Sequence, residues 1–303
     1  MKTIGVIILI IFCSPLKVFG QGSALVKINK WLTDNHFAIR QTFDGSKNEN
    51  KPASLSFQNN HKTTNDYLNV DLAIKLFQVE LLKNKSSILL FYPKVEWHKS
   101  DDSTQVKNKL DGGVNFEYIP FGLKSPNLPR NLPNKGLLIA PWFNGISSYK
   151  RNFIDSVNEV KLAFQLSLVS NYRFLPGSSI RDSDDNFRAR YYPYFGFEYY
   201  YIPDFISKGV TEKFSTYFVR IFVEIWIIPQ TLQFNIDGTY REIITDKNST
   251  SLNSSLPALT STLYLFPGKQ ESLGIGYEYK HGYDNNSKFQ LVQISSIKFA
   301  WKI

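Results

Sequence analysis

The 303-residue sequence predicts an all-β fold, a closed antiparallel β-barrel that crosses a membrane with about twelve strands. Three observations support this prediction. Long segments alternate between apolar and other residues, charges recur in mid-strand on the second face, and the alternation continues to the last residue, Ile303. Aromatic residues make up 15% of the chain, a share that suits a barrel with aromatic girdles at the membrane interfaces.

The first twenty residues have the pattern of a secretory signal peptide. Lys2 precedes an apolar run from Ile4 to Phe12, and the small residue Gly20 marks the expected cleavage point. A lipoprotein cut before Cys13 is the alternative, but Phe12 is a poor match to the small residue that such a site needs. Cleavage after about Gly20 removes the only cysteine, which excludes disulfides, thiol nucleophiles and thiolate metal sites from the mature chain.

The segment that follows, residues 21–35, has a different pattern. Leu25, Ile28, Trp31 and Leu32 fall on one helical face, so a short helix is one interpretation of this N-terminal segment and an irregular lead-in is the other. The transmembrane barrel is expected to occupy residues 36–303.

The alternating segments predict where the strands lie. In residues 68–76 every second residue from Leu68 to Leu76 is apolar, and the phase changes at Phe77, which predicts a β-bulge near Leu76. Segments of about ten residues are long enough to cross a membrane when tilted, whereas typical strands of a soluble sandwich have about five or six. The expected strands are 36–45, 67–82, 85–99, 105–120, 136–149, 157–172, 187–202, 213–229, 231–245, 255–267, 270–282 and 288–302.

Short and long connections mostly alternate along the chain, as expected for a barrel with tight turns at one rim and loops at the other. Tight turns are expected near residues 83–84, 229–231 and 267–270. Two stretches, 123–136 and 175–186, are long where this alternation predicts a short turn. Ten or fourteen strands therefore also fit the sequence.

The second face of the strands carries the recurring charges and is expected to line the barrel interior. Twelve strands lie between the eight whose interior is filled by side chains and the sixteen to eighteen that leave an aqueous channel. Bases facing a narrow lumen would attract anions, while acids in the same lumen would oppose this preference or pair with the bases. The expected lumen-facing residues are Asp71, Lys75, Lys94, Glu96, Lys161, Arg188, Arg190, Glu198, Arg220, Glu224, Glu278 and Lys280.

The last strand ends in SSIKFAWKI, in which Ile297, Phe299, Trp301 and Ile303 form one apolar face. An exported chain with alternating strands and such a terminal strand resembles the Gram-negative outer-membrane β-barrel proteins. The resemblance implies insertion into outer-membrane lipid and recognition of the terminal strand by the barrel-assembly machinery, although Ile303 replaces the usual terminal Phe. It is a resemblance of architecture and names no functional family.

Three functions fit this architecture. The preferred one is a narrow porin-like channel for passive passage of small polar solutes, with a weak anion preference and no enzymatic activity. The second is a closed structural barrel, or one whose external loops bind a partner. The third is a lipid hydrolase similar to outer-membrane phospholipase A, with His98 as its base. The histidine motif of that enzyme requires Asn and Gly after Ser100, where this chain has Asp101 and Asp102.

Other ligands receive little support from the sequence. The formal net charge is +9, but the basic residues are scattered and no nucleic-acid motif accompanies them. No cofactor is expected. The acidic stretches 101–102 and 182–185 could supply oxygen ligands to calcium, but they lack the spacing of an EF-hand loop. Tyr192, Tyr194 and Tyr200 could stack on sugars or planar solutes, although an aromatic girdle is the preferred use of this tyrosine cluster.

Overall fold

The structure, a computed structural model, describes residues 38–43, 51–61, 65–83, 87–100, 107–124, 136–153, 158–178, 180–181, 188–205, 210–244, 254–267, 273–284 and 290–301. The expected signal peptide (residues 1–20), the segment 21–35 and Ile303 lie outside the described residues. Within the described part, the chain forms fifteen strands. No helix there is long and apolar enough to cross a membrane.

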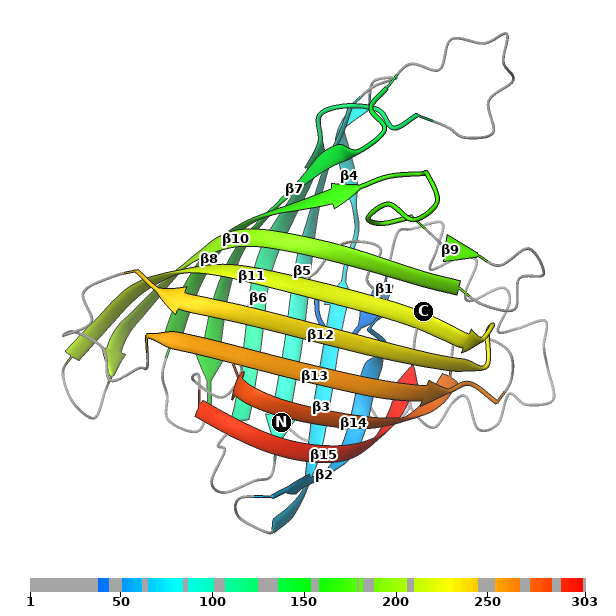
Figure 1. Cartoon of the computed structure of the whole chain (residues 1–303). Coiled ribbons are helices and arrows are strands. Elements are labelled where there is room, and N and C mark those ends of the chain that lie inside the picture. Colours follow the sequence, from blue (N-terminus) through cyan, green and yellow to red (C-terminus); the bar gives the residue numbers. More distant parts are fainter. Residues whose placement is uncertain are drawn as a thin grey trace, which may run out of the picture.

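Twelve of the strands form a closed antiparallel barrel (Figure 1), which confirms the predicted fold class and strand number. In barrel order they are β2 (Ala53–Asn60), β3 (Asn65–Lys75), β5 (Ile88–Ser100), β6 (Lys107–Ile119), β7 (Ala140–Asn152), β8 (Asn158–Val169), β10 (Arg188–Phe205), β11 (Val210–Ile228), β12 (Leu232–Ile243), β13 (Ser255–Leu265), β14 (Leu273–Asp284) and β15 (Gln290–Trp301).

The barrel is closed by the terminal strand. β15 pairs with β2 from Ile294 opposite Asn60 to Trp301 opposite Ala53, so the last strand leaves no open edge. Closure matters because unpaired backbone groups cannot be exposed to hydrocarbon. Three short strands extend this wall: β1 (Ala38–Arg40) pairs with β3, β4 (Val79–Lys83) pairs with β5, and β9 (Ile180–Arg181) pairs with β10.

The predicted bulge near Leu76 is confirmed by the pairing of β3 and β4 with the same strand. Lys75 lies opposite Lys94, and Val79 lies opposite Phe91. The chain therefore advances four residues from Lys75 to Val79, while β5 covers the same distance in three, from Phe91 to Lys94. One extra residue in one strand is a β-bulge, and it explains the change of phase in the sequence.

The expected strand at residues 36–45 is wrong. Of these residues, only Ala38–Arg40 forms a strand, and it pairs with the end of β3. Along the rest of the same edge, β3 pairs with β2, where Ser54 lies opposite Asp71. The described residues 41–43 and 51–52 belong to no strand, and we call them the insert. β2 was missed because its inner face begins with the small polar residues Ser54 and Ser56, which give a weak pattern.

The barrel has an apolar exterior and a polar interior, the reverse of a soluble protein. Large apolar side chains on the outer face are exposed, with Phe57 at 58% and Ile297 at 53%. The neighbouring inward residues Ser56 and Lys298 are fully buried. Phe299 also faces outward, and Trp301 is half-buried. An apolar belt of this kind needs a hydrocarbon environment.

The two long connections that break the sequence alternation lie at the same rim as the tight turns. The turn at 229–231 joins β11 directly to β12, as predicted, whereas 120–139 and 170–187 join β6 to β7 and β8 to β10. The long connections contact each other, because Ser170 Oγ donates to the Leu138 carbonyl at 2.7 Å and Asn171 Nδ2 to the Lys124 carbonyl at 3.2 Å. Their described residues therefore form added structure at one rim.

Aromatic clusters fill much of the barrel interior. The rings of Tyr200 and Phe214 stack with centroids 4.8 Å apart, and those of Trp226 and Phe266 lie 5.6 Å apart. On β14 a Cβ at Gly276 would come within 2.7 Å of the Tyr264 ring, so glycine is needed where that ring crosses the strand. These clusters leave a narrow free space, which lies among the charged residues.

Candidate functional site in the barrel interior

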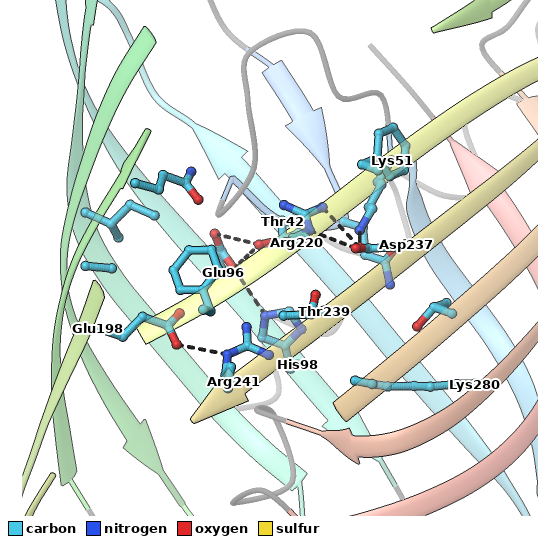
Figure 2. Close-up of a pocket in the computed structure, with 18 of the residues that line it drawn as sticks. Thr42, Lys51, Glu96, His98, Glu198, Arg220, Asp237, Thr239, Arg241 and Lys280 are labelled. Atoms are coloured by element: carbon cyan, nitrogen blue, oxygen red, sulfur yellow. Dashed lines mark hydrogen bonds and ion pairs between the residues drawn. The ribbon is translucent and has the colours of Figure 1, made fainter. Parts of the chain in front are cut away.

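A cavity of about 200 Å³ lies inside the barrel (Figure 2). Of the residues expected to face the lumen, six line it: Glu96, Lys161, Glu198, Arg220, Glu278 and Lys280. Three others are buried but do not line the cavity: Asp71, Lys94 and Glu224. The last three are half-buried and do not line it either: Lys75, Arg188 and Arg190. Further charged lining residues are Lys51, His98, Asp111, Lys150, Asp237 and Arg241.

One group of charges joins β11, β12 and the insert. Arg220 holds Asp237 with two hydrogen bonds, from Nε to Oδ1 at 2.7 Å and from Nη2 to Oδ2 at 3.0 Å. Lys51 of the insert donates to the same carboxylate from its Nζ and lies over the Phe222 ring. Asp237 therefore binds a cation from the barrel wall and a cation from the insert, which ties the two together.

A second group is centred on Glu198 of β10. Its carboxylate accepts a hydrogen bond from Arg241 Nε at 2.9 Å, forms an ion pair with Lys161 Nζ at 3.2 Å and accepts a hydrogen bond from Thr216 Oγ1 at 3.3 Å. Three different strands thus supply the partners of one buried acid. Because charges in a low-dielectric interior are costly without partners, this arrangement is expected to hold the wall rigidly.

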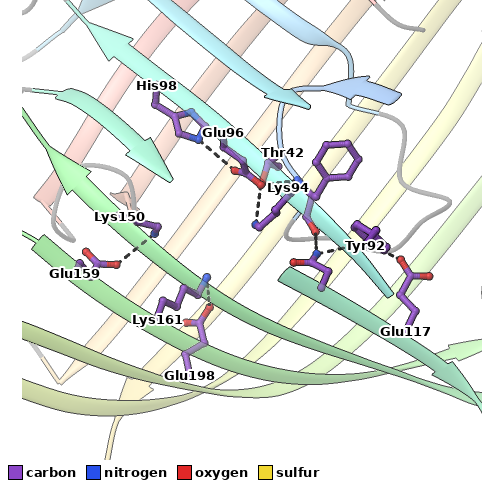
Figure 3. Close-up of polar contacts among 12 residues, drawn as sticks. Thr42, Tyr92, Lys94, Glu96, His98, Glu117, Lys150, Glu159, Lys161 and Glu198 are labelled. Atoms are coloured by element: carbon purple, nitrogen blue, oxygen red, sulfur yellow. Dashed lines mark hydrogen bonds and ion pairs between the residues drawn. The ribbon is translucent and has the colours of Figure 1, made fainter. Parts of the chain in front are cut away.

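A third group lies on the opposite wall and is shown in Figure 3. Glu96 of β5 forms an ion pair with Lys94 at 2.7 Å and contacts His98 Nε2 at 3.3 Å. It also accepts hydrogen bonds from the insert, from Thr42 Oγ1 at 3.1 Å and from the Phe43 backbone N–H at 2.9 Å. Glu96 is therefore the second anchor of the insert.

The base of the insert is fixed to the barrel wall by further contacts. Asn115 Nδ2 donates to the Phe43 carbonyl at 2.9 Å, and the Phe43 ring is buried against Tyr92 with centroids 6.1 Å apart. The Gln41 backbone N–H donates to the Lys51 carbonyl at 2.9 Å, which joins the two described ends of the insert. The insert thus reaches Glu96 on one wall and Asp237 on the other.

The position of His98 does not favour a hydrolase. Its Nδ1 contacts Asp71 Oδ1 at 2.7 Å while Nε2 contacts Glu96, so each ring nitrogen faces a carboxylate. A catalytic base needs one nitrogen for the nucleophile. The His98 ring is also buried in the lumen wall.

The inward tyrosines of β10 are not exposed to a solute. Tyr192 and Tyr200 are fully buried and stack on Phe222 and Phe214, and Arg220 lies over the Tyr194 ring at 5.1 Å. They pack the wall and do not offer free ring faces.

Metal binding is not supported in the part of the chain that the structure describes, where no group of three or more His, Cys, Asp or Glu side chains could hold an ion. The acidic stretches 101–102 and 182–185 lie outside the described residues.

Sequence analysis missed several lining residues on β12 and the insert. Asn235, Asp237, Thr239 and Arg241 alternate along β12 and face inward together. The alternation of these polar residues with outward residues predicts that they face the lumen. The pattern is weak because one of the outward residues is Gly238, which has no side chain. Lys51 could not be found in this way, since the insert has no strand pattern.

Comparisons with protein-family models and with curated protein sequences find no match. Among solved structures, the NanC porin aligns over 83% of this chain and 100% of its own, with 10% identity and a TM-score of 0.43. The transport unit of the autotransporter AIDA-I from Escherichia coli aligns over 91% and 97%, with 9% identity and a TM-score of 0.39. The beta domain of the Bordetella autotransporter Brka aligns over 88% and 97%, with 8% identity and a TM-score of 0.36.

The closed ring of twelve strands, the apolar exterior and the polar interior together define the class of this protein. It has the architecture of the Gram-negative outer-membrane β-barrel proteins, as its sequence predicted.

Proposed function

We propose that this protein is an outer-membrane channel that lets small polar solutes pass through a narrow lumen by diffusion. The observation that carries the proposal is the cavity of about 200 Å³, lined by charged and polar groups from both walls. The lumen is expected to be narrow because the insert reaches into it, where Phe43 binds Glu96 and Lys51 binds Asp237.

A weak anion preference follows from the charges on the cavity wall. The described lining residues include six lysines and arginines and five acids. Lys161, Arg220 and Arg241 are each bound to a carboxylate, so their attraction for a passing anion is largely cancelled. The small excess of cations gives the direction of the preference, and the pairing makes it weak.

The proposal is tested by single-channel recording of the mature protein in a planar bilayer under a salt gradient. Discrete current steps with a reversal potential displaced slightly toward anions are expected. A folded barrel that gives no steps would overturn the channel and favour the second candidate, a closed barrel that displays its loops. The aromatic clusters and paired charges in the interior are the observations that favour that candidate.

The terminal strand is proposed to serve as the signal for barrel assembly. Ile297 and Phe299 are exposed on the outer face of β15, the strand that completes the ring. Trp301 and Ile303 continue the same apolar alternation in the sequence. Replacing Phe299 by Ser is expected to lower the amount of barrel recovered from the outer membrane, while the same change at Phe57 on β2 should have a smaller effect.

A further inference from the structure

A serine and a histidine lie within hydrogen-bonding distance on the outer face of the barrel. His61 Nε2 is 2.8 Å from Ser295 Oγ, and this contact is exposed. Ser295 belongs to β15, and His61 follows the end of β2, where its backbone N–H donates to the Gln293 carbonyl at 3.0 Å. The pair therefore joins the two strands that close the ring.

The alternation of both strands places this pair on the lipid side. Ile297, two residues after Ser295, is 53% exposed on the outer face, whereas Ser296 between them is buried in the interior. His61 continues the outward face of β2, four residues after the exposed Phe57. Because the outer face of such a barrel is in contact with lipid, a lipid molecule reaches the pair without entering the lumen.

The pair lies at a border between polar and apolar positions of the outer face. Asn59 and Tyr279 lie opposite Ser295 on the two adjacent strands, and both are polar. Toward the far end of the same strands, the next outward residues are Ile297 and Phe57, which lie opposite each other and are exposed. The acyl esters of a lipid lie between its hydrocarbon and its headgroups. Ser295 is therefore level with lipid ester groups.

The hydrogen bonds of Ser295 direct its proton to the histidine. Tyr277, which is 55% exposed on β14, donates its hydroxyl to Ser295 Oγ at 3.2 Å. The serine hydroxyl has one proton to donate, and His61 Nε2 is its acceptor when the histidine carries its own proton on Nδ1. This is the arrangement of a nucleophile and its base. His98, by contrast, has a carboxylate at each ring nitrogen.

We propose that Ser295 and His61 hydrolyse an acyl ester of the surrounding lipid. Ser295 Oγ attacks the ester carbonyl carbon while His61 Nε2 takes the hydroxyl proton, and the Tyr277 hydroxyl donates to the oxyanion that forms. The tetrahedral intermediate breaks its bond to the alcohol oxygen, which takes the proton from His61 and leaves. Water then attacks the acyl-serine. His61 takes a proton from this water and returns it to Ser295 Oγ as the fatty acid leaves.

The surroundings of Ser295 favour an ester with a long acyl chain over a water-soluble one. Phe57 and Ile297 are exposed on the hydrocarbon side of the pair, where an acyl chain packs against them while its ester group lies at Ser295. Phospholipids and lipid A both carry esters of this kind. The reaction requires no passage through the lumen, so it is independent of the proposed channel.

The test measures the release of fatty acid by the mature barrel in vesicles of palmitoyl-oleoyl phosphatidylethanolamine and phosphatidylglycerol with a minor share of lipid A. Mass spectrometry distinguishes the two sources, because lipid A releases hydroxylated fatty acids and these phospholipids release palmitate or oleate. The wild type is expected to release fatty acid from at least one source. Ser295→Ala should abolish the release, and His61→Gln should slow it about a hundredfold or more. Tyr277→Phe should slow it about a hundredfold, the effect of losing one oxyanion donor.

Ser255→Ala is the matched control, because Ser255 Oγ also contacts a tyrosine hydroxyl on the outer face, that of Tyr240 at 3.1 Å. It should leave the release unchanged. A fluorophosphonate probe should label Ser295 in the wild type but not in His61→Gln, which a purely structural hydrogen bond would not produce. A wild-type barrel that releases no fatty acid from either source, or whose Ser295 is not labelled, would overturn the inference. Undiminished release by Ser295→Ala would overturn it as well.

Discussion

The β10–β12 wall and the β7 wall of the same lumen use polar residues in opposite ways. On β10–β12, Glu198 and Asp237 each gather two cations, from neighbouring strands and from the insert. On β7, Asn144 and Ser148 are as buried as Glu198 but hold no described partner. A buried polar group that is fully paired stabilises the fold, whereas one without a partner costs free energy.

The comparison assigns different roles to the two walls. The ion pairs of β10–β12 fix the strands and the insert relative to each other and leave little charge for a solute. On the β7 wall, Asn144 and Ser148 lack the protein partners that stabilise the charges of β10–β12. Stability measurements should therefore respond strongly to changes in the first wall and weakly to changes in the second.

The largest effect is expected for Glu198→Leu. The change leaves Lys161 and Arg241 buried without their shared carboxylate, and breaking a buried ion pair from one side costs about 3–5 kcal/mol. The free energy of unfolding in detergent, measured by urea titration, should fall by this amount. Glu242→Leu on the outer face of β12, two strands away from β10, is the control and should cost about 1 kcal/mol or less. A Glu198→Leu barrel as stable as the control would show that the pairs do not hold the wall.

A smaller loss of stability and a clear change in conductance are expected for Lys51→Met. Arg220 keeps both of its hydrogen bonds to Asp237, so the free energy of unfolding should fall by only about 1 kcal/mol. The insert, however, loses one of its two anchors, and the single-channel conductance should rise. Selectivity should also move toward cations because the lumen loses a positive charge.

The control for Lys51→Met is Lys99→Met, because Lys99 is exposed on β5 and does not line the cavity. It should leave the conductance unchanged. If both variants conduct like the wild type, the insert does not narrow the path.

The sequence predicted the wall of this barrel well and its interior only in part. Alternation located eleven strands and the bulge near Leu76, because the choice between lipid and lumen repeats every second residue. It could not predict that Arg241 would meet Glu198, 43 residues away, since this pairing depends on the register of three strands. The insert was invisible to this method because Thr42, Phe43 and Lys51, which bind Glu96 and Asp237, belong to no strand.

A shift in ion selectivity is expected for Arg188→Glu. Arg188 is half-buried at the start of β10, and its Nε has no hydrogen-bond partner among the described residues. It is a better choice than Arg220, whose replacement would also break the contact with Asp237. The reversal potential in a salt gradient should move toward cations by a measurable amount, and Arg151→Glu, at an exposed position on β7, should leave it unchanged. Equal shifts in the two variants would show that only net charge matters.

The smallest effect is expected for Ser148→Ala, and it tests the comparison most directly. Because Ser148 Oγ is buried without a partner, removing it deletes a desolvated group and breaks no hydrogen bond. The free energy of unfolding should stay within about 0.5 kcal/mol of the wild type or rise slightly. Ser167→Ala on β8 is the matched control, because its Oγ donates to the Pro193 carbonyl at 2.8 Å, and it should cost about 1 kcal/mol. If Ser148→Ala destabilised the barrel as much as Ser167→Ala, then Ser148 would be hydrogen-bonded in the native protein, and the β7 wall would be as fully paired as β10–β12.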